Sequence, residues 1–86
     1  MELQNKRFVV TGGAGFIGSE LVHQLAKAGA SVIAVDNLTN GKIENLEDIL
    51  GNQVKLEVLD IRDIDAMEKL ISGADAVYHL ACLGVR

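Results

Sequence analysis

Residues 11–20 read TGGAGFIGSE, and four of these ten residues are glycine. The stretch follows an apolar run, Arg7–Thr11 (RFVVT), and precedes a helical pattern, so it joins a strand to a helix. Gly12 lets the chain turn sharply off the strand, and Gly15, which lacks a Cβ, lets a bound group approach the backbone. Gly18 allows the helix to lie close against the sheet. A loop of this kind predicts a diphosphate site, because the free N–H groups and the dipole of a helix N-terminus favour anions.

The glycine spacing is also compatible with other loops. Gly13, Gly15 and Gly18 form a second, overlapping G-x-G-x-x-G spacing, so spacing alone does not choose between the two sets. The separation of Gly13 from Gly18 also matches the phosphate-binding loop of P-loop NTPases. That loop continues with Lys-Ser or Lys-Thr, whereas Ser19-Glu20 follows here, so its phosphate-clamping lysine is missing and this interpretation is rejected. The remaining alternative is a glycine-rich turn that binds no ligand.

Four short β-rich runs alternate with three helical patterns along the chain. The runs are Arg7–Thr11, Ser31–Asp36 (SVIAVD), Val54–Leu59 (VKLEVL) and Ala76–Leu80 (AVYHL). Their near-continuous apolar character is typical of strands that are covered on both faces, as in a parallel sheet. Strand–helix alternation with right-handed crossovers therefore predicts an α/β fold: a partial, Rossmann-like doubly wound parallel sheet of strand order 3-2-1-4 with three helices.

Apolar residues at helical spacing define the three helices. Their faces are Ile17, Leu21, Val22, Leu25 and Ala28; then Ile43, Leu46, Ile49 and Leu50; then Ile64, Met67, Leu70 and Ile71. Each pattern ends at a glycine, where a left-handed conformation closes a helix without steric cost. These glycines are Gly29, Gly51 and Gly73. The expected N-caps are Thr39 or Asn40 for the second helix and Asp63 for the third.

Asp36 ends the second strand candidate, at the position where a carboxylate accepts hydrogen bonds from both ribose hydroxyls of an adenosine. A negative charge there repels the 2′-phosphate of NADP. No arginine follows directly, and the nearest following cation is Lys42. The sequence therefore favours NAD as the cofactor, with an NADP-dependent reductase as the alternative. Taken alone, Asp36 would also fit a solvated residue at a strand end.

Composition and charge exclude several classes of function. The 86 residues make one small domain, with 49% hydrophobic residues, 23% charged residues and a formal net charge of −4. No cluster of Lys or Arg offers a footprint for nucleic acid, and the apolar runs are far shorter than a bilayer span, so neither partner is expected. Cys82 is the sole cysteine and no apolar segment of signal-peptide length is seen, so a cytoplasmic location is expected.

Neither histidine is assigned to chemistry. His23 falls on the polar or boundary face of the first helical pattern, and His79 falls in the last strand, where a structural role beside the glycine loop is expected. No other His or Cys lies at metal-ligand spacing, so no metal site is expected.

Together with the glycine loop, three further motifs resemble the extended short-chain dehydrogenase/reductase family, and within it the NAD-dependent sugar-nucleotide epimerases and dehydratases. The matching stretches are TGGAGFIGS (11–19), VDNLTNGKIENL (35–46), LDIRD (59–63) and YHLAC (78–82), followed by LGVR. They occur in the family's order and cover almost the whole chain. Enzymes similar to UDP-glucose 4-epimerase show the greatest resemblance.

The resemblance implies cofactor-binding roles for the matching positions. The residues implied to line the pyrophosphate are Gly12, Gly15, Phe16, Ile17 and Gly18. At the adenosine ribose it implies Asp36 and Asn37, with Asn40 and Gly41 nearby. At the adenine it implies Asp60, which accepts from the exocyclic amine, and Ile61. Along the central and nicotinamide-ribose part it implies the backbone of Leu80, Ala81 and Cys82, although the family usually carries Ala or Gly where Cys82 stands.

The family's catalytic Tyr-x-x-x-Lys pair has no counterpart in residues 1–86. In the family, the lysine lowers the pKa of the tyrosine, whose phenolate takes a sugar hydroxyl proton while hydride moves to NAD. Tyr78 is the sole tyrosine, and Ala81 and Cys82 follow it at the third and fourth positions. No catalytic residue is therefore assigned. Residues 1–86 are expected to be an incomplete NAD(P)-binding segment, inactive alone, whose nucleotide-sugar substrate is bound only by a longer parent.

A second interpretation comes from a different class of function. Under it, the chain is a non-catalytic binding or assembly module that forms homo-oligomers through its exposed sheet edge.

Overall fold

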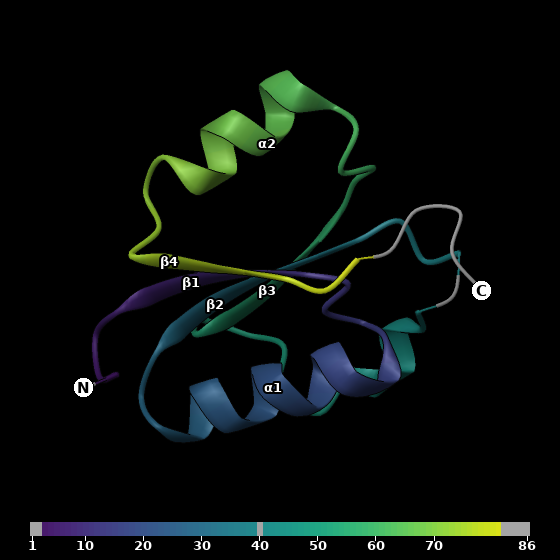
Figure 1. The fold of residues 1–86 in the computed structure, drawn as a ribbon. Coiled ribbons are helices and arrows are strands. Elements are labelled where there is room, and N and C mark those ends of the chain that lie inside the picture. The colour runs from purple at the N-terminus through teal and green to yellow at the C-terminus, as the bar shows by residue number, and fades with distance from the viewer. Residues whose placement is uncertain (1–2, 40, 82–86) are drawn as a thin grey trace.

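The computed structural model of the protein describes residues 3–39 and 41–81, and Figure 1 shows a single sheet between helical layers. The elements in chain order are β1 (Arg7–Thr11), α1 (Phe16–Lys27), β2 (Ser31–Asp36), a 3-10 helix η1 (Ile43–Asn45), β3 (Val54–Val58), α2 (Ile64–Ile71) and β4 (Ala76–His79). The strand order is β3-β2-β1-β4, and all three neighbouring pairs are parallel. The predicted Rossmann-like sheet and its strand order are therefore confirmed.

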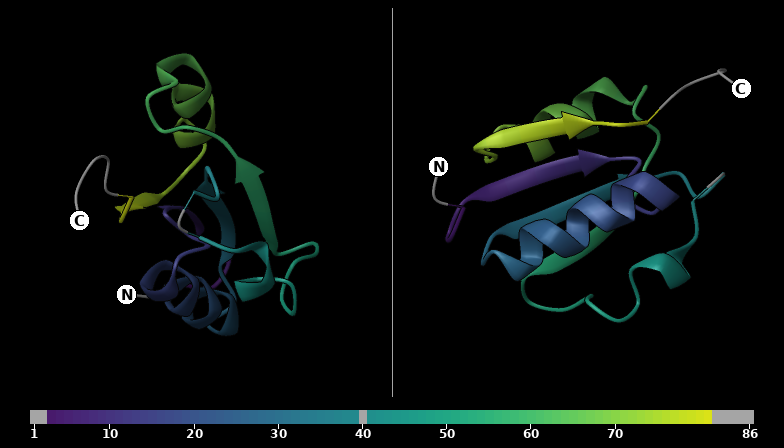
Figure 2. Two further views of the ribbon diagram at one scale, coloured as in Figure 1. Left: turned by 90° about the vertical axis from the view of Figure 1, so that its right-hand side faces the viewer. Right: turned by 60° about the horizontal axis from the view of Figure 1, so that its bottom comes forward.

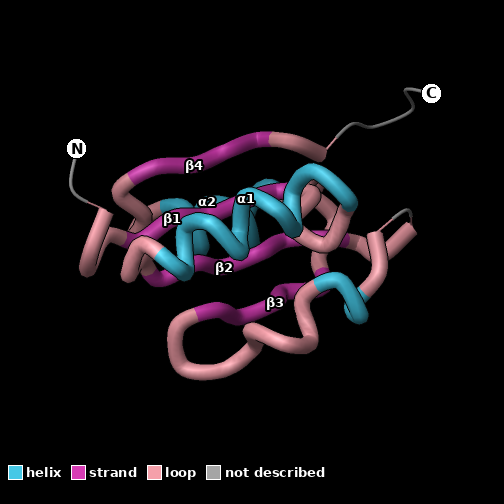
Figure 3. The backbone as a smooth tube through the Cα atoms, turned by 90° about the horizontal axis from the view of Figure 1, so that it is seen from below, coloured by secondary structure: helices cyan, strands magenta, loops and turns pink. Residues whose placement is uncertain are grey.

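The two faces of the sheet are covered from opposite sides. α1 and η1 lie on one face and α2 lies on the other, as Figure 2 and the view from below in Figure 3 show. Because successive side chains of a strand point to opposite faces, Phe8 and Val10 enter the core on the α1 face, whereas Val9 enters the smaller core with Val35 and Met67 on the α2 face. None of the described helices is long and apolar enough to cross a bilayer.

The predicted second α-helix over residues 43–50 is wrong. The chain makes only the three-residue helix η1, after which Ile49 and Leu50 both donate backbone hydrogen bonds to the carbonyl of Leu46 in a tight turn. Of the apolar face expected there, Leu46 is fully buried, whereas Ile43 and Leu50 are 40% and 36% exposed. Leu46 and the partly buried Ile49 pack against the core and anchor a turn, but two residues give a short helix too little packing to offset the cost of nucleation.

The expected helix ends are confirmed in part. Gly29 closes α1 with a left-handed φ of 92°, but Gly51 and Gly73 do not adopt a positive φ. Asp63 caps α2 by accepting a 3.2 Å hydrogen bond from the N–H of Ala66. The residue that precedes η1 is Lys42, so Thr39 is not its N-cap. The other residue considered for that cap, Asn40, lies outside the described residues.

Candidate cofactor site

The glycine loop crosses from the end of β1 to the start of α1, close against β2. Gly12 has a φ of +72°, and its N–H and that of Gly13 both donate to the carbonyl of Val35. A Cβ added to Gly13 would lie 2.6 Å from the Cβ of Ala34, so only glycine lets the loop rest on β2. The sequence left the role of Gly13 open, and the tertiary contact with Ala34 decides it.

Two further glycines differ in what surrounds them. A Cβ at Gly18 would overlap the carbonyl oxygen of Gly12, so the first turn of α1 lies directly on the loop rather than only near the sheet. A Cβ at Gly15 would meet a single described atom, the carbonyl oxygen of Gly12, at 3.3 Å. Gly18 is therefore required by packing, whereas a Cβ at Gly15 would make this one tight contact and meet no other described atom within 4 Å.

The N-terminus of α1 is exposed and has no side-chain cap. Gly15 occupies the N-cap position with φ −76° and ψ 176°, and the first turn contains no acidic residue. Helix geometry leaves the N–H groups of Phe16, Ile17 and Gly18 without intrahelical partners. Phe16 and Ile17 are 91% and 72% exposed. Within the described residues, this helix end therefore combines donors that no side chain caps, a positive dipole end and two exposed residues, which together favour an anion.

Asp36 lies at the end of β2 beside this loop. Its carboxylate accepts from the N–H of Ala14 through Oδ2 at 3.0 Å and from the N–H of Leu38 through Oδ1 at 2.7 Å. The residue is 8% exposed. A carboxylate has about four lone-pair directions, so these two bonds leave acceptor capacity on both oxygens. Sequence reasoning selected Asp36 but missed both of its backbone partners.

The segment after β2 lies over Asp36 and Ala14. A Cβ at Gly41, which is buried, would lie 2.6 Å from Asp36 Oδ2. The carbonyl of Ala14 accepts from the backbone N–H of Lys42 at 3.0 Å and from the side-chain amide of Asn45 at 2.7 Å. Asn37 is exposed and accepts from the N–H of Thr39. Sequence reasoning missed Asn45, although it falls within the NGKIEN stretch that carries the resemblance.

The chain after β4 lies against the other side of the glycine loop. A Cβ on Gly12 would lie 3.0 Å from the backbone nitrogen of Ala81. The fully buried Thr11 holds this contact, since its Oγ1 accepts from the N–H of Ala81 at 3.2 Å and lies 2.8 Å from Nδ1 of His79. The structure thus brings Leu80 and Ala81 to the glycine loop, and His79 has a structural contact there. Cys82 lies outside the described residues.

Asp60 and Ile61, the two residues expected at the adenine, both contact other residues of the chain. Arg62 binds both carboxylate oxygens of Asp60 through its guanidinium, with Nη2 2.6 Å from Oδ2, and also donates its backbone N–H to Oδ1. The hydrogen bonds from the Arg62 side chain, then from its backbone, lower the pKa of Asp60 to about 2. Ile61 packs against the core on the α2 face. Asp60 is therefore an ionised carboxylate oriented by Arg62.

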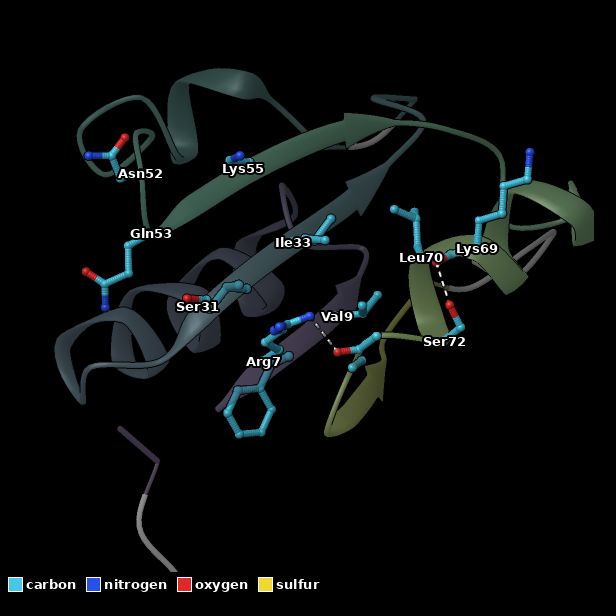
Figure 4. A pocket seen from close by; sticks show the side chains of 14 residues that line it. Arg7, Val9, Ser31, Ile33, Asn52, Gln53, Lys55, Lys69, Leu70 and Ser72 are labelled. Carbon is cyan, nitrogen blue, oxygen red and sulfur yellow. Dashed lines mark hydrogen bonds between the residues drawn. The ribbon is translucent and has the colours of Figure 1, made fainter. Parts of the chain in front are cut away.

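The predicted residues that the structure brings together share one edge of the sheet. β1, β2 and β4 are parallel neighbours in one sheet, so their carboxyl ends lie side by side (Figure 2). The glycine loop follows β1, Asp36 is the last residue of β2, and Leu80–Ala81 follow β4. A separate groove of about 420 Å³ lies on the α2 face among Arg7, Ser31 and Leu70 (Figure 4). None of the predicted cofactor residues lines it. Within residues 3–39 and 41–81, no cluster of His, Cys, Asp or Glu could hold a metal ion.

A glycine loop at the first strand–helix junction and a carboxylate at the end of the second strand define the class of Rossmann-like dinucleotide-binding segments. Residues 8–85 match the model of the NAD dependent epimerase/dehydratase family, and the chain belongs to that family. The family resemblance carried by the motifs is therefore confirmed.

Its curated relatives are enzymes of nucleotide sugars. A UDP-N-acetyl-alpha-D-glucosaminuronate decarboxylase from Bacillus cytotoxicus is 44% identical over 82 residues, which cover 94% of this chain and 25% of the relative. UDP-glucose 4-epimerase 2 from Arabidopsis thaliana is 41% identical over an alignment 86 positions long, and the match covers 91% of this chain and 25% of the relative. The chain therefore spans about a quarter of the length of these relatives.

Solved structures of such enzymes share the fold. The Bordetella bronchiseptica enzyme WbmF, in complex with NAD+ and UDP, has a TM-score of 0.82 and 36% identity, and the match covers 94% of this chain and 24% of WbmF. UDP-glucose 4-epimerase from Thermotoga maritima, solved with UDP-glucose, has a TM-score of 0.78 and 41% identity, over 91% of this chain and 25% of that enzyme.

Proposed function

We propose that this chain binds NAD at the carboxyl edge of its sheet, as the cofactor-binding part of a nucleotide-sugar epimerase, dehydratase or decarboxylase. The observation that carries the proposal is the contact between Asp36 and Ala14, which holds a carboxylate directly beside the uncapped start of α1. A dinucleotide needs both elements at once, an anion site for its diphosphate and an acceptor for its adenosine ribose.

The diphosphate is assigned to the start of α1. The N–H groups of Phe16, Ile17 and Gly18 lack intrahelical partners, and anions are stabilised at such a helix end. The missing Cβ of Gly15 gives a phosphate access to the backbone. Phe16 and Ile17 are exposed residues, whereas Gly18 is buried.

The adenosine ribose is assigned to Asp36. Each carboxylate oxygen already accepts one backbone hydrogen bond and retains acceptor capacity for a ribose hydroxyl. Its negative charge disfavours the 2′-phosphate of NADP, so the proposal is specific for NAD. At the adenine, we propose that Asp60 accepts from the exocyclic amine, in competition with Arg62.

Bound NAD would supply a reversible acceptor for a hydride from a sugar carbon. The role of the present residues is to bind and orient the dinucleotide, with Leu80 and Ala81 passing its central part beside Gly12. Residues 1–86 contain no Tyr-x-x-x-Lys sequence. We therefore assign the proton transfers and the sugar site to a longer parent chain, and we expect no turnover from these residues alone.

A second candidate function is assembly through the edge of the sheet. Within residues 3–39 and 41–81, β4 pairs with β1 and with no other strand. Val77 and Tyr78 on this strand are 38% and 39% exposed. An edge strand with exposed apolar side chains is a site for pairing with a second copy.

Calorimetric titration with NAD, combined with light scattering on the same sample, separates the two functions. A monomer that takes up NAD, and takes up NADP more weakly, supports the cofactor-binding function. A dimer that produces no heat with NAD supports assembly and refutes the cofactor proposal.

A further inference from the structure

Both peptide groups that flank the Cα of Ala14 are held by side chains from later in the chain. In the Gly13–Ala14 unit, the N–H donates to Asp36 Oδ2 at 3.0 Å. In the Ala14–Gly15 unit, the carbonyl accepts from the side-chain amide of Asn45 at 2.7 Å, and the N–H of Gly15 donates to the carbonyl of Gly12 at 3.1 Å. Because each peptide unit is planar, fixing one end fixes the direction of the other.

Asn45 reaches the loop because η1 places it there. The backbone N–H of Asn45 donates to the carbonyl of Lys42, and the next residue, Leu46, is fully buried in the core on the α1 face. The residue itself is exposed, but its amide points to the carbonyl of the fully buried Ala14. With the N–H of Lys42, it supplies a donor for each lone pair of that carbonyl.

Gly41 packs tightly against Asp36 and Ala14, so these residues have little room to move. A Cβ on Gly41 would lie 2.6 Å from Asp36 Oδ2 and 2.9 Å from the carbonyl carbon of Ala14. The segment that carries Lys42 and Asn45 is thus in close contact with both the carboxylate and the loop. The side chain of Asn45 itself bonds the carbonyl of the Ala14–Gly15 peptide, so a change at Asn45 acts on the start of α1 through that peptide.

We propose that Asn45 is a positioning residue for the diphosphate half of the site. It orients the peptide from which α1 begins, and so aims the free N–H groups of the first turn, without itself touching the ligand. This inference rests on the proposed binding of NAD. It predicts that a substitution at Asn45 lowers the affinity for ligands that carry a diphosphate. The affinity for ligands that are bound through Asp36 alone should hardly change.

The test compares ADP with adenosine in NMR titrations of the full chain and three variants. Asn45→Ala is expected to lower the affinity for ADP about five- to tenfold, as the loss of one hydrogen bond allows. It is expected to lower the affinity for adenosine by less than about twofold. Asn45→Gln, which keeps an amide donor on a longer side chain, is expected to recover ADP binding to within about twofold of the unmodified chain. Asn52→Ala, a matched change at an exposed asparagine of another loop, is expected to alter neither affinity.

The outcomes separate this inference from the function on which it rests. If Asn45→Ala lost equal affinity for ADP and adenosine, Asn45 would be a structural residue and the inference would be overturned. A lowered melting temperature with unchanged ADP affinity would have the same consequence. Asn45→Gln binding ADP as poorly as Asn45→Ala would also overturn it. An unmodified chain that binds neither ADP nor NAD refutes the proposed function, and the inference with it.

Discussion

The backbone N–H of Ala14 donates a 3.0 Å hydrogen bond to Oδ2 of Asp36, which joins the glycine loop to the end of β2. The bond is buried and links residues 22 positions apart. The carboxylate proposed to bind a ribose therefore also holds the loop proposed to bind a diphosphate. A substitution at Asp36 acts on both halves of the site, and its effects on stability and on binding have to be measured separately.

Asp36→Ala is expected to lower the affinity for NAD by about tenfold or more, and the affinity for NADP by less. The reason is that only NAD has both ribose hydroxyls free to bind the carboxylate. Calorimetric titration with both dinucleotides measures the difference. The same change deprives the N–H groups of Ala14 and Leu38 of their acceptor, so a loss of unfolding free energy of about 1–3 kcal/mol in urea is also expected. Equal losses of affinity for the two dinucleotides would remove the ribose assignment.

Gly15 and Gly18 are expected to fail in different ways when substituted. Gly15→Val places a side chain in the space proposed for the diphosphate, so NAD binding is abolished while the helical circular dichroism is retained. Gly18→Ala forces a Cβ into the carbonyl oxygen of Gly12, so the fold itself loses stability. Circular dichroism, urea unfolding and NAD titration of both variants measure the contrast. A folded Gly15→Val variant that binds NAD normally would place the diphosphate elsewhere.

Thr11→Val is expected to destabilise the end of β4. The change keeps the side-chain shape but removes the oxygen that accepts from Ala81 and contacts His79, at a cost of about 1–3 kcal/mol in unfolding free energy. Thr11→Ser, which retains the hydroxyl, serves as the control and should lose only about 1 kcal/mol for the missing methyl group. Urea unfolding and hydrogen exchange of the Ala81 amide measure both changes. A valine variant as stable as the unmodified chain contradicts the role of this hydroxyl.

His23 is expected to make stability depend on pH. Its Nδ1 lies 2.7 Å from the carbonyl oxygen of Ser19 and its Nε2 lies 3.1 Å from Asp48 Oδ1. Both oxygens only accept, so both contacts are hydrogen bonds at the same time only when the imidazole is protonated. The hydrogen bond to Ser19 is the largest cause that raises the pKa of His23 above its ordinary 6.5; partial burial opposes it, and Asp48 adds to it.

Because the folded state binds this proton more tightly, the stabilisation is complete below the unfolded pKa and is lost as pH rises through the folded one. The unfolding free energy, taken relative to His23→Gln, is therefore expected to fall as the pH rises above the ordinary histidine pKa of 6.5. Asp48→Asn should reduce this dependence without abolishing it, since the bond to Ser19 remains. Parallel curves for the unmodified chain and His23→Gln over this rise in pH would contradict the assignment. Sequence analysis assigned His23 only to a boundary face and missed both partners.

The local pattern of the chain determined the fold and the position of the candidate site. Apolar runs of strand length, separated by helical patterns, were enough to predict the order β3-β2-β1-β4, because parallel strands joined by right-handed crossovers leave few arrangements. The glycine loop and Asp36 could be selected as candidate site residues because each lies at the end of a predicted strand. These properties depend on periodicity and on steric size, both of which a sequence contains.

Only the tertiary structure decided what depends on partners distant in the chain. The apolar spacing of residues 43–50 predicted an α-helix, yet a single buried leucine and the bonds from Lys42 and Asn45 to Ala14 produced η1 and a turn instead. Gly13 is needed because of Ala34, and Thr11 matters because of Ala81. Such hydrogen bonds and close contacts have no periodic signature, because they depend on the distance in space between atoms that folding alone brings together.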